Sequence, residues 1–299
     1  MTEISKSQFV AGLAESIERL KAKSKERAVL LQAAEQAKQE ILAEAQKPQK
    51  KGEQIAFSFL PVELTRVSPF FPINRRDRNK PRDEVETVIK NPWGTITVRG
   101  PVLSIYDEDV MLAILSLVHK KKSNVLETTP YEICRIMNIT PAGNTYSAIL
   151  KSFDYLQDTS FILQTKTLRI RVRPLDKVIS DKGQQKYLVE VDEVFLSLFA
   201  EGIVTSLNLT FRRGLKGDIT KALYRFYRGQ SGTSQNYHIL TIAKAINLNI
   251  DQPLFRIRAQ IKRGLQELKR QGYLSKYGIK GDVAITETGG KPAKGRLVQ

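Results

Sequence analysis

Basic side chains recur at helical spacing in the segment Leu254–Gly272, LFRIRAQIKRGLQELKRQG. At about 100° per residue, the apolar side chains of a helix here fall on one line, namely Leu254, Ile257, Ile261, Leu265 and Leu268. The opposite line holds Arg256, Arg263 and Arg270, with Gln260 and Lys262 on either side. Such a helix would bury one side and present a cationic side, which suits the major groove of DNA because that groove is wide enough to admit a helix.

These residue types suit two kinds of DNA contact. Arg binds guanine and Gln binds adenine through paired hydrogen bonds, which predicts three base-reading residues: Arg256, Gln260 and Arg263. Phosphate contacts fix the register without reading sequence, and they are predicted at Arg258, Lys262, Lys269 and Arg270 and, from a preceding loop, at Arg212, Arg213 and Lys216. The alternative is an amphipathic helix whose charges face only water.

A second basic row lies earlier in the chain. Arg169, Arg171 and Arg173 alternate in a strand-like run, so their side chains project from one face of a sheet. The wing of a winged helix could lay such a row along phosphates, and we predict phosphate contacts there. The polar outer face of a half-buried strand is the alternative.

The net charge is concentrated near the C-terminus. The 299 residues carry 48 Lys and Arg against 31 Asp and Glu, a net charge of +17, and residues 212–299 alone hold 18 basic and 5 acidic side chains, or +13. This imbalance favours a nucleic acid as partner over a merely solubilising surface.

A membrane is disfavoured because no apolar run approaches the roughly 20 residues that span a bilayer. The start MTEISKSQ also lacks the apolar core of a signal peptide, so we expect a cytoplasmic protein associated with bacterial DNA.

Catalytic and metal-binding patterns are missing from the sequence. The single cysteine, Cys134, excludes an internal disulfide, and the isolated His119 and His238 do not form the paired metal site of a rolling-circle nickase. No phosphate-binding loop of the form Gly-x-x-x-x-Gly-Lys-Ser/Thr occurs, which disfavours ATP-driven unwinding by this chain. We therefore expect a protein that is not an enzyme and needs no cofactor or metal.

Caps and apolar spacing indicate how the chain would position these residues. Residues 6–45 favour a helix, and residues 54–82 are a proline-rich connector. Ser104 or Asp107 would cap a helix that ends near His119, and Thr129 with Pro130 would open a second one, with Tyr131, Ile133, Cys134 and Ile136 buried. A third helix is predicted over Asn144–Gln157, and strands over Trp93–Val98, Phe161–Thr165, Leu168–Arg173 and Tyr187–Val191. Helices followed by a small antiparallel sheet are the order of a winged helix.

The order then recurs toward the C-terminus. A strand is predicted over Val204–Phe211, helices over Asp218–Arg228, Thr241–Asn247 and Pro253–Gln271, and a hairpin from Tyr273 to Ile285. The predicted fold class is α+β and predominantly helical, with two tandem winged-helix domains after a helical N-terminal extension. The predicted boundaries are 1–52 for the extension and linker, 53–203 for the first domain with its connector, 204–288 for the second domain, and 289–299 for a disordered tail.

Over residues 54–285 the chain resembles the TrfA-type plasmid replication initiators, a branch of the iteron-binding Rep proteins. Four patterned blocks carry the resemblance, namely TPYEICRIMNI (Thr129–Ile139), VDEVFLSLFAEG (Val191–Gly202), ALYRFYRG (Ala222–Gly229) and RAQIKRGLQELKRQGYL (Arg258–Leu274). The resemblance implies tandem winged helices, binding to repeated double-stranded DNA sites at a plasmid origin, opening of adjacent A·T-rich DNA and recruitment of the host replicative helicase. It also implies a homodimer in equilibrium with a monomer that acts at the origin, and a second domain that supplies the main base-reading helix.

The same resemblance singles out a peptide ahead of the first domain. Members of the family can carry a sliding-clamp-binding motif there, and this chain has Gln54, Phe57 and Phe59 at that place. Phe57 replaces the usual Leu and the spacing is one residue longer, so the peptide could instead pack on the first domain as an edge strand.

Taken together, the sequence predicts a sequence-specific DNA-binding initiator of plasmid replication. The alternatives are a winged-helix transcriptional repressor and an architectural DNA-binding protein without sequence preference.

Overall fold

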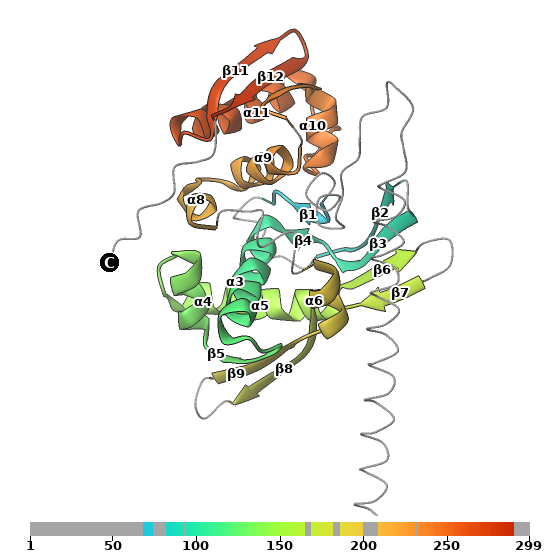
Figure 1. Ribbon diagram of the computed structural model, residues 1–299, viewed down its shortest axis with the longest axis vertical. Helices are drawn as coiled ribbons and strands as arrows, with labels where there is room; N and C mark the ends of the chain where they lie inside the picture. Colours follow the sequence, from blue (N-terminus) through green and yellow to red (C-terminus); the bar gives the residue numbers. More distant parts are fainter. Residues whose placement is uncertain are drawn as a thin grey trace, which may run out of the picture.

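The computed structural model describes residues 68–73, 82–91, 94–164, 169–181, 186–199, 209–230 and 232–289 (Figure 1). The predicted N-terminal helix and linker, the clamp-binding candidates Gln54, Phe57 and Phe59, and the predicted tail beyond Gly289 lie outside these residues. Predictions for those segments therefore stay predictions.

The first unit is a winged helix built around a buried helix. Its elements are, in chain order, α3 (Ile105–Lys121), β5 (Val125–Thr128), α4 (Pro130–Met137), α5 (Gly143–Asp158), β8 (Leu175–Asp181) and β9 (Lys186–Val191). The three strands form an antiparallel sheet in the order β5-β9-β8, in which β8 and β9 are the hairpin of the wing.

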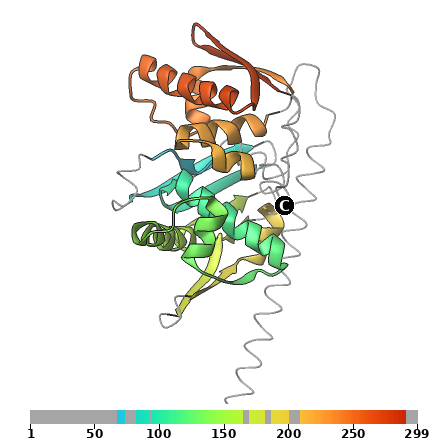
Figure 2. The same ribbon diagram turned by 90° about the vertical axis from the view of Figure 1, so that its left-hand side faces the viewer.

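The second unit repeats this topology. Its elements are α9 (Asp218–Arg228), β10 (Ser234–His238), α10 (Ile239–Ala245), α11 (Leu254–Arg270), β11 (Leu274–Lys280) and β12 (Val283–Thr288). The sheet order β10-β12-β11 again places the last strand between the first and the second. Figure 2 shows the orange and red elements of this unit stacked on the cyan and green elements of the first.

A four-stranded sheet extends the first unit. It is formed by β2 (Glu84–Asn91), β3 (Gly94–Pro101), β6 (Ser160–Gln164) and β7 (Arg169–Val172), all antiparallel and in that order. The short strands β1 (Phe70–Phe71) and β4 (Leu103–Ser104) pair in parallel beside α3. Two short helices, α6 (Glu193–Phe199) and α8 (Leu209–Gly214), lie in the chain between the two winged helices.

The expectation of a predominantly helical fold is wrong. About 45% of the described residues are helical and about 32% are in strands, which makes the fold a mixed one with several antiparallel sheets. The sequence analysis missed β1, β2, β4, β5, β8 and β10. Of these, β1, β4, β5 and β10 have only two to five residues, too few to show a periodicity. The sequence analysis also predicted a strand over Val204–Phe211, whereas Leu209–Phe211 begins α8.

Local capping explains where the helices of the first unit begin. Ser104 Oγ accepts from the Asp107 backbone N–H, and Asp107 Oδ2 accepts from the Ser104 backbone N–H at 2.6 Å, so the two residues form a capping box for α3. Thr129 caps α4 by accepting from the Glu132 N–H at 3.1 Å, with Pro130 in the first turn as predicted. The prediction that Tyr131 is buried is wrong, because 52% of it is exposed.

Candidate nucleic-acid interface

The buried side of α11 fixes the direction of its cationic side. Ile257, Ile261, Leu265 and Leu268 are fully buried, as the spacing predicted, whereas Leu254 is half-buried against the core. Gly264 lies where α11 packs on α9, and a Cβ atom there would come within 2.4 Å of Leu223 Cδ1. The absence of a side chain at this position therefore allows the two helices to approach closely, which leaves the opposite side of α11 facing outward.

The three predicted base-reading residues lie on or beside this outward side. Arg256 and Arg263 are exposed, whereas Gln260 is half-buried. The Gln260 side chain is held by Gln252, whose Nε2 donates to Gln260 Oε1 at 3.1 Å. Both arginines are thus placed to reach a groove, and Gln260 would have to exchange one side-chain partner for a base.

The residues of α11 that are predicted to contact phosphates differ in whether their charges already form ion pairs within the protein. Lys262 and Lys269 are exposed, and Lys269 Nζ lies 5.9 Å from the ring centre of Tyr277. Arg258 forms an ion pair with Asp282, and Arg270 donates to Glu267 from Nε at 2.9 Å. Among the described residues, Lys262 and Lys269 therefore stand out as candidates that no ion pair on α11 competes for.

A cleft of about 960 Å³ separates the two units and is lined by the third helix of each. From α11 it receives Gln260, Arg263 and Glu267, and from α5 it receives Asn144 and Lys151. Lys216, in the connection between α8 and α9, lines the same cleft and is exposed. The two third helices therefore face a common space rather than opposite sides of the molecule.

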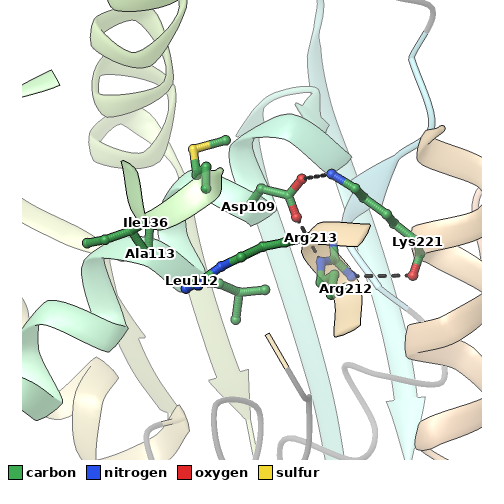
Figure 3. Close-up of a pocket in the computed structure, with 8 residues that line it drawn as sticks. Asp109, Leu112, Ala113, Ile136, Arg212, Arg213 and Lys221 are labelled. Carbon is green, nitrogen blue, oxygen red and sulfur yellow. Dashed lines mark hydrogen bonds and ion pairs between the residues drawn. The ribbon is translucent and has the colours of Figure 1, made fainter. Parts of the chain in front are cut away.

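Arg212 does not reach that space, which corrects the prediction of a phosphate contact. It lies in α8 and only 2% of its side chain is exposed, since its guanidinium is bound inside the protein (Figure 3). Its Nη2 donates to Glu108 Oε2 at 2.8 Å and its Nε to Asp109 Oδ1 at 2.7 Å. Arg213, the next residue, is half-buried beside Leu112 and Ile136 in the small pocket drawn in Figure 3.

The pKa of Asp109 is set by its positively charged neighbours Arg212 and Lys221. Burial by itself raises the pKa of Asp109, but the positive charges of Arg212 and Lys221, together with their hydrogen bonds, outweigh burial and hold that pKa below its usual value. Lys221 Nζ lies 2.5 Å from Asp109 Oδ2. Asp109 is therefore ionised at neutral pH, and its ion pairs join α3 to α8 and α9.

The arginine row of the first unit is exposed but is not on its wing. Arg169, Arg171 and Arg173 are exposed and alternate with the buried Ile170 and Val172, as the spacing predicted. Arg169 and Arg171 lie in β7, the edge strand of the four-stranded sheet, and Arg173 follows that strand, whereas the wing hairpin is formed by β8 and β9. The expectation of a wing that carries these arginines is therefore wrong, and phosphate contact by them stays a prediction.

A comparison with protein families shows which known proteins part of this chain is similar to. Residues 93–228 match the family model described as Initiator Replication protein, WH1. Through this region, which is less than half of the chain, the sequence is similar to replication initiator proteins. The matched residues run from the start of β3 to the end of α9, so they include the first winged helix and the buried ion pairs that bind it to the second unit.

Two solved structures of RctB share the fold of this chain at low sequence identity, and a third structure is less similar. Domains 2 and 3 of RctB superpose with a TM-score of 0.56 at 13% identity, covering 77% of this chain and 99% of that one. A second structure of RctB domains 2–3 gives a TM-score of 0.52 at 12% identity, covering 76% and 97%. The Pi initiator protein in complex with iteron DNA gives 0.42 at 12% identity, covering 61% and 95%. No curated protein matches the sequence significantly.

The described part of the chain lacks both a membrane-spanning helix and a metal-binding cluster. None of its helices combines the length and the apolar character that crossing a membrane requires. No group of three or more His, Cys, Asp or Glu side chains in the described residues is arranged to hold a metal ion.

The sequence analysis missed one residue of the α11 surface. Phe255, in the first turn of α11, is 64% exposed, and the Arg256 guanidinium carbon lies 5.9 Å from its ring centre. The helical wheel held the signal, because Phe255 falls about 100° from the line through Leu254 and the other core residues. An exposed ring beside an exposed arginine at the start of the third helix of a winged helix is suited to contact a thymine methyl group.

Proposed function

We propose that this chain is an initiator that starts plasmid replication by binding repeated sites of double-stranded DNA at the origin with α11 in the major groove. One observation carries the proposal. The side of α11 that bears Arg256, Lys262, Arg263 and Lys269 is exposed, while its opposite side packs against the core. A cationic helix face that the described residues leave open to solvent is what contact with the bases and phosphates of a major groove requires.

The first unit adds a second set of contacts to the same duplex. Asn144 and Lys151 of α5 line the same cleft as Arg263 of α11, and Lys216 lines it too. A duplex bound along α11 would thus pass close to α5. Because both units would hold one DNA molecule, their contacts add to the affinity without the entropic cost of a second association.

The free energy of binding to the repeated sites would then help to open the DNA at the origin. The proposed initiator occupies several adjacent sites, and the strain of bending falls on the most deformable steps beside them, which are the pyrimidine–purine steps common in A·T-rich DNA. The sequence offers no nucleotide-binding loop, so continued unwinding is assigned to the host helicase that the initiator recruits.

Binding selection from a library of random duplexes tests the proposal and separates its rivals. The full chain is incubated with the library at moderate salt, and bound duplexes are sequenced after several rounds. We expect one enriched motif that also occurs as repeats beside the gene. A single palindromic motif would indicate a repressor, and duplex binding without any enriched motif would indicate an architectural protein. If the chain bound no duplex at all, the proposed role of α11 would be refuted. The double variant Arg256→Ala, Arg263→Ala is the matched control, and it should enrich no motif.

A further inference from the structure

The turn between α10 and α11 places a second glutamine against Gln260. Gln252 lies in this turn, two positions before α11 begins at Leu254, and its Nε2 donates to the Asn249 carbonyl at 2.7 Å and to Gln260 Oε1 at 3.1 Å. In the other direction, Gln260 Nε2 donates to Gln252 Oε1 at 3.4 Å, close to the longest distance for a hydrogen bond. Both glutamine side chains are half-buried. The two amides therefore form an unequal pair with one ordinary and one long hydrogen bond.

The Asn249 carbonyl fixes the orientation of this pair. A backbone carbonyl only accepts hydrogen bonds, so the Gln252 amide must turn its nitrogen toward Asn249, because the reverse orientation would bring two oxygen atoms together. The second hydrogen of the same nitrogen points to Gln260, which must answer with its own oxygen. In the described part of the chain, Gln260 Nε2 has only the long bond to Gln252 Oε1. The amide nitrogen of Gln260 is therefore the atom that is free to bind a ligand.

The place of Gln260 on α11 brings this nitrogen to the proposed DNA side. Gln260 and Arg263 lie about one helical turn apart and line the same cleft, so in a major groove they would reach neighbouring base pairs. An N–H group binds base atoms that accept, which in this groove are N7 of adenine and guanine, O6 of guanine and O4 of thymine. Cytosine presents only its amino donor there. An amide held with its nitrogen toward the bases would therefore reject cytosine.

We propose that Gln252 is a positioning residue, which holds the Gln260 amide nitrogen toward the DNA and so excludes cytosine as the base that Gln260 contacts. The inference rests on the proposed function, because it takes α11 to lie in the major groove. On binding, Gln260 Nε2 exchanges its long bond to Gln252 Oε1 for a base, while the bond from Gln252 Nε2 to Gln260 Oε1 keeps the amide from turning. Gln252 contacts no base in this arrangement. The choice of base is thus set from the turn that precedes the base-reading helix.

Two substitutions of Gln252 test this role by selection from random duplexes. Gln252→Glu introduces a carboxylate that only accepts, so the Gln260 amide turns its nitrogen to the carboxylate and its oxygen to the DNA. That oxygen accepts from the amino groups of cytosine and adenine but meets only acceptors on guanine and thymine. Gln252→Met has a similar volume and leaves both orientations open. We expect the wild type to deplete cytosine at one position of its site, Gln252→Met to accept every base there, and Gln252→Glu to admit cytosine and deplete guanine and thymine.

Further variants separate this effect from a loss of stability. Both substitutions remove the donor to the Asn249 carbonyl, so a merely structural role of Gln252 would affect the two variants in the same way. Gln260→Ala should abolish the preference at that one position, and adding Gln252→Glu to it should change nothing further. Gln271→Glu adds the same charge at the C-terminal end of α11, and it should weaken binding to every duplex by a similar factor without changing the choice of base.

Fluorescence anisotropy on two duplexes that differ only in having guanine or cytosine at this position measures the effect. We expect the wild type to bind the guanine duplex about five- to tenfold more tightly, and Gln252→Glu to reverse this preference. A preference that Gln252→Glu leaves as in the wild type, or one that Gln260→Ala does not abolish, would overturn the inference and leave the proposed function standing. A wild type that enriches no motif in the selection would overturn both.

Discussion

Arg212 Nη2 donates to Glu108 Oε2 over 2.8 Å although 104 positions separate the two residues in the chain. Arg225 of α9 donates to the same carboxylate oxygen from Nη1, and Glu108, Arg212 and Arg225 are each only 2% exposed. In the described part of the protein, Arg225 Nε and Nη2 have no hydrogen-bond partner. One glutamate of α3 thus forms ion pairs with two arginines, one in the connection and one in the second unit, which couples the two winged helices electrostatically.

Removing the Glu108 carboxylate should lower the free energy of unfolding of the protein. Glu108→Gln leaves two buried guanidinium groups short of negative charge, and we expect the free energy of unfolding to fall by about 3–5 kcal/mol. Urea denaturation followed by circular dichroism measures the loss. The matched control is Glu86→Gln, whose ion pair with Arg99 is about half exposed and should contribute no more than about 1 kcal/mol. Equal losses in the two variants would contradict the coupling.

Asp109 should make stability depend on pH in the acidic range. Its pKa is lower in the folded protein than in the unfolded chain, so the folded state binds this proton less readily. The resulting stabilisation is fully present above the ordinary carboxyl pKa of about 4 and is lost as the pH falls through the folded value. Unfolding free energies of the wild type and Asp109→Asn, measured at neutral and acidic pH, should converge toward acid. A difference that stays constant with pH would disprove this role.

Gly264 should tolerate no side chain without cost. Gly264→Ala would bring Cβ within 2.4 Å of Leu223 Cδ1, and we expect a net destabilisation of about 1–3 kcal/mol from overpacking, despite the better helix propensity of Ala. Thermal unfolding measures the change. Gly143→Ala, at the start of α5, is the control because no heavy atom beyond its own neighbours lies within 4 Å of the new Cβ. Equal effects at the two positions would argue against close packing of α11 on α9.

Arg263 is predicted to read a base. Arg263→Ala should cost about 1–3 kcal/mol of binding free energy on the selected site and much less on random duplex. Fluorescence anisotropy at one fixed salt concentration measures both affinities. Arg99→Ala, which removes an exposed arginine far from α11 in the four-stranded sheet, should change neither. An equal loss on both duplexes would assign Arg263 to phosphate contact.

Lys269 is predicted to bind a phosphate. Lys269→Ala should weaken binding to every duplex by a similar factor and reduce the slope of log affinity against log salt by about one unit. The slope is obtained from anisotropy titrations over a series of salt concentrations. A slope equal to that of the wild type would mean that the Lys269 ammonium faces only water and the Tyr277 ring.

Local features were readable from the sequence because their physical causes act over a few residues. The capping signals at Ser104 and Thr129 placed two helix starts, and the apolar spacing from Ile257 to Leu268 fixed the buried side of α11 and therefore the exposed side that bears Arg263. Alternation in residues 169–173 likewise gave an exposed arginine row. Backbone hydrogen bonds and helical periodicity involve near neighbours, so they leave a pattern in a short window of sequence.

What the tertiary structure alone decided depends on partners far along the chain. The burial of Arg212 follows from Glu108 and Asp109, about a hundred residues earlier, and no local pattern distinguishes such an arginine from one that faces DNA. The place of β7 in the four-stranded sheet follows from its pairing with β6, which pairs in turn with β3 upstream of α3. Ion pairs and strand pairing between distant segments form only when the chain has folded, so their outcome is set by packing of the whole molecule and not by the residues on either side.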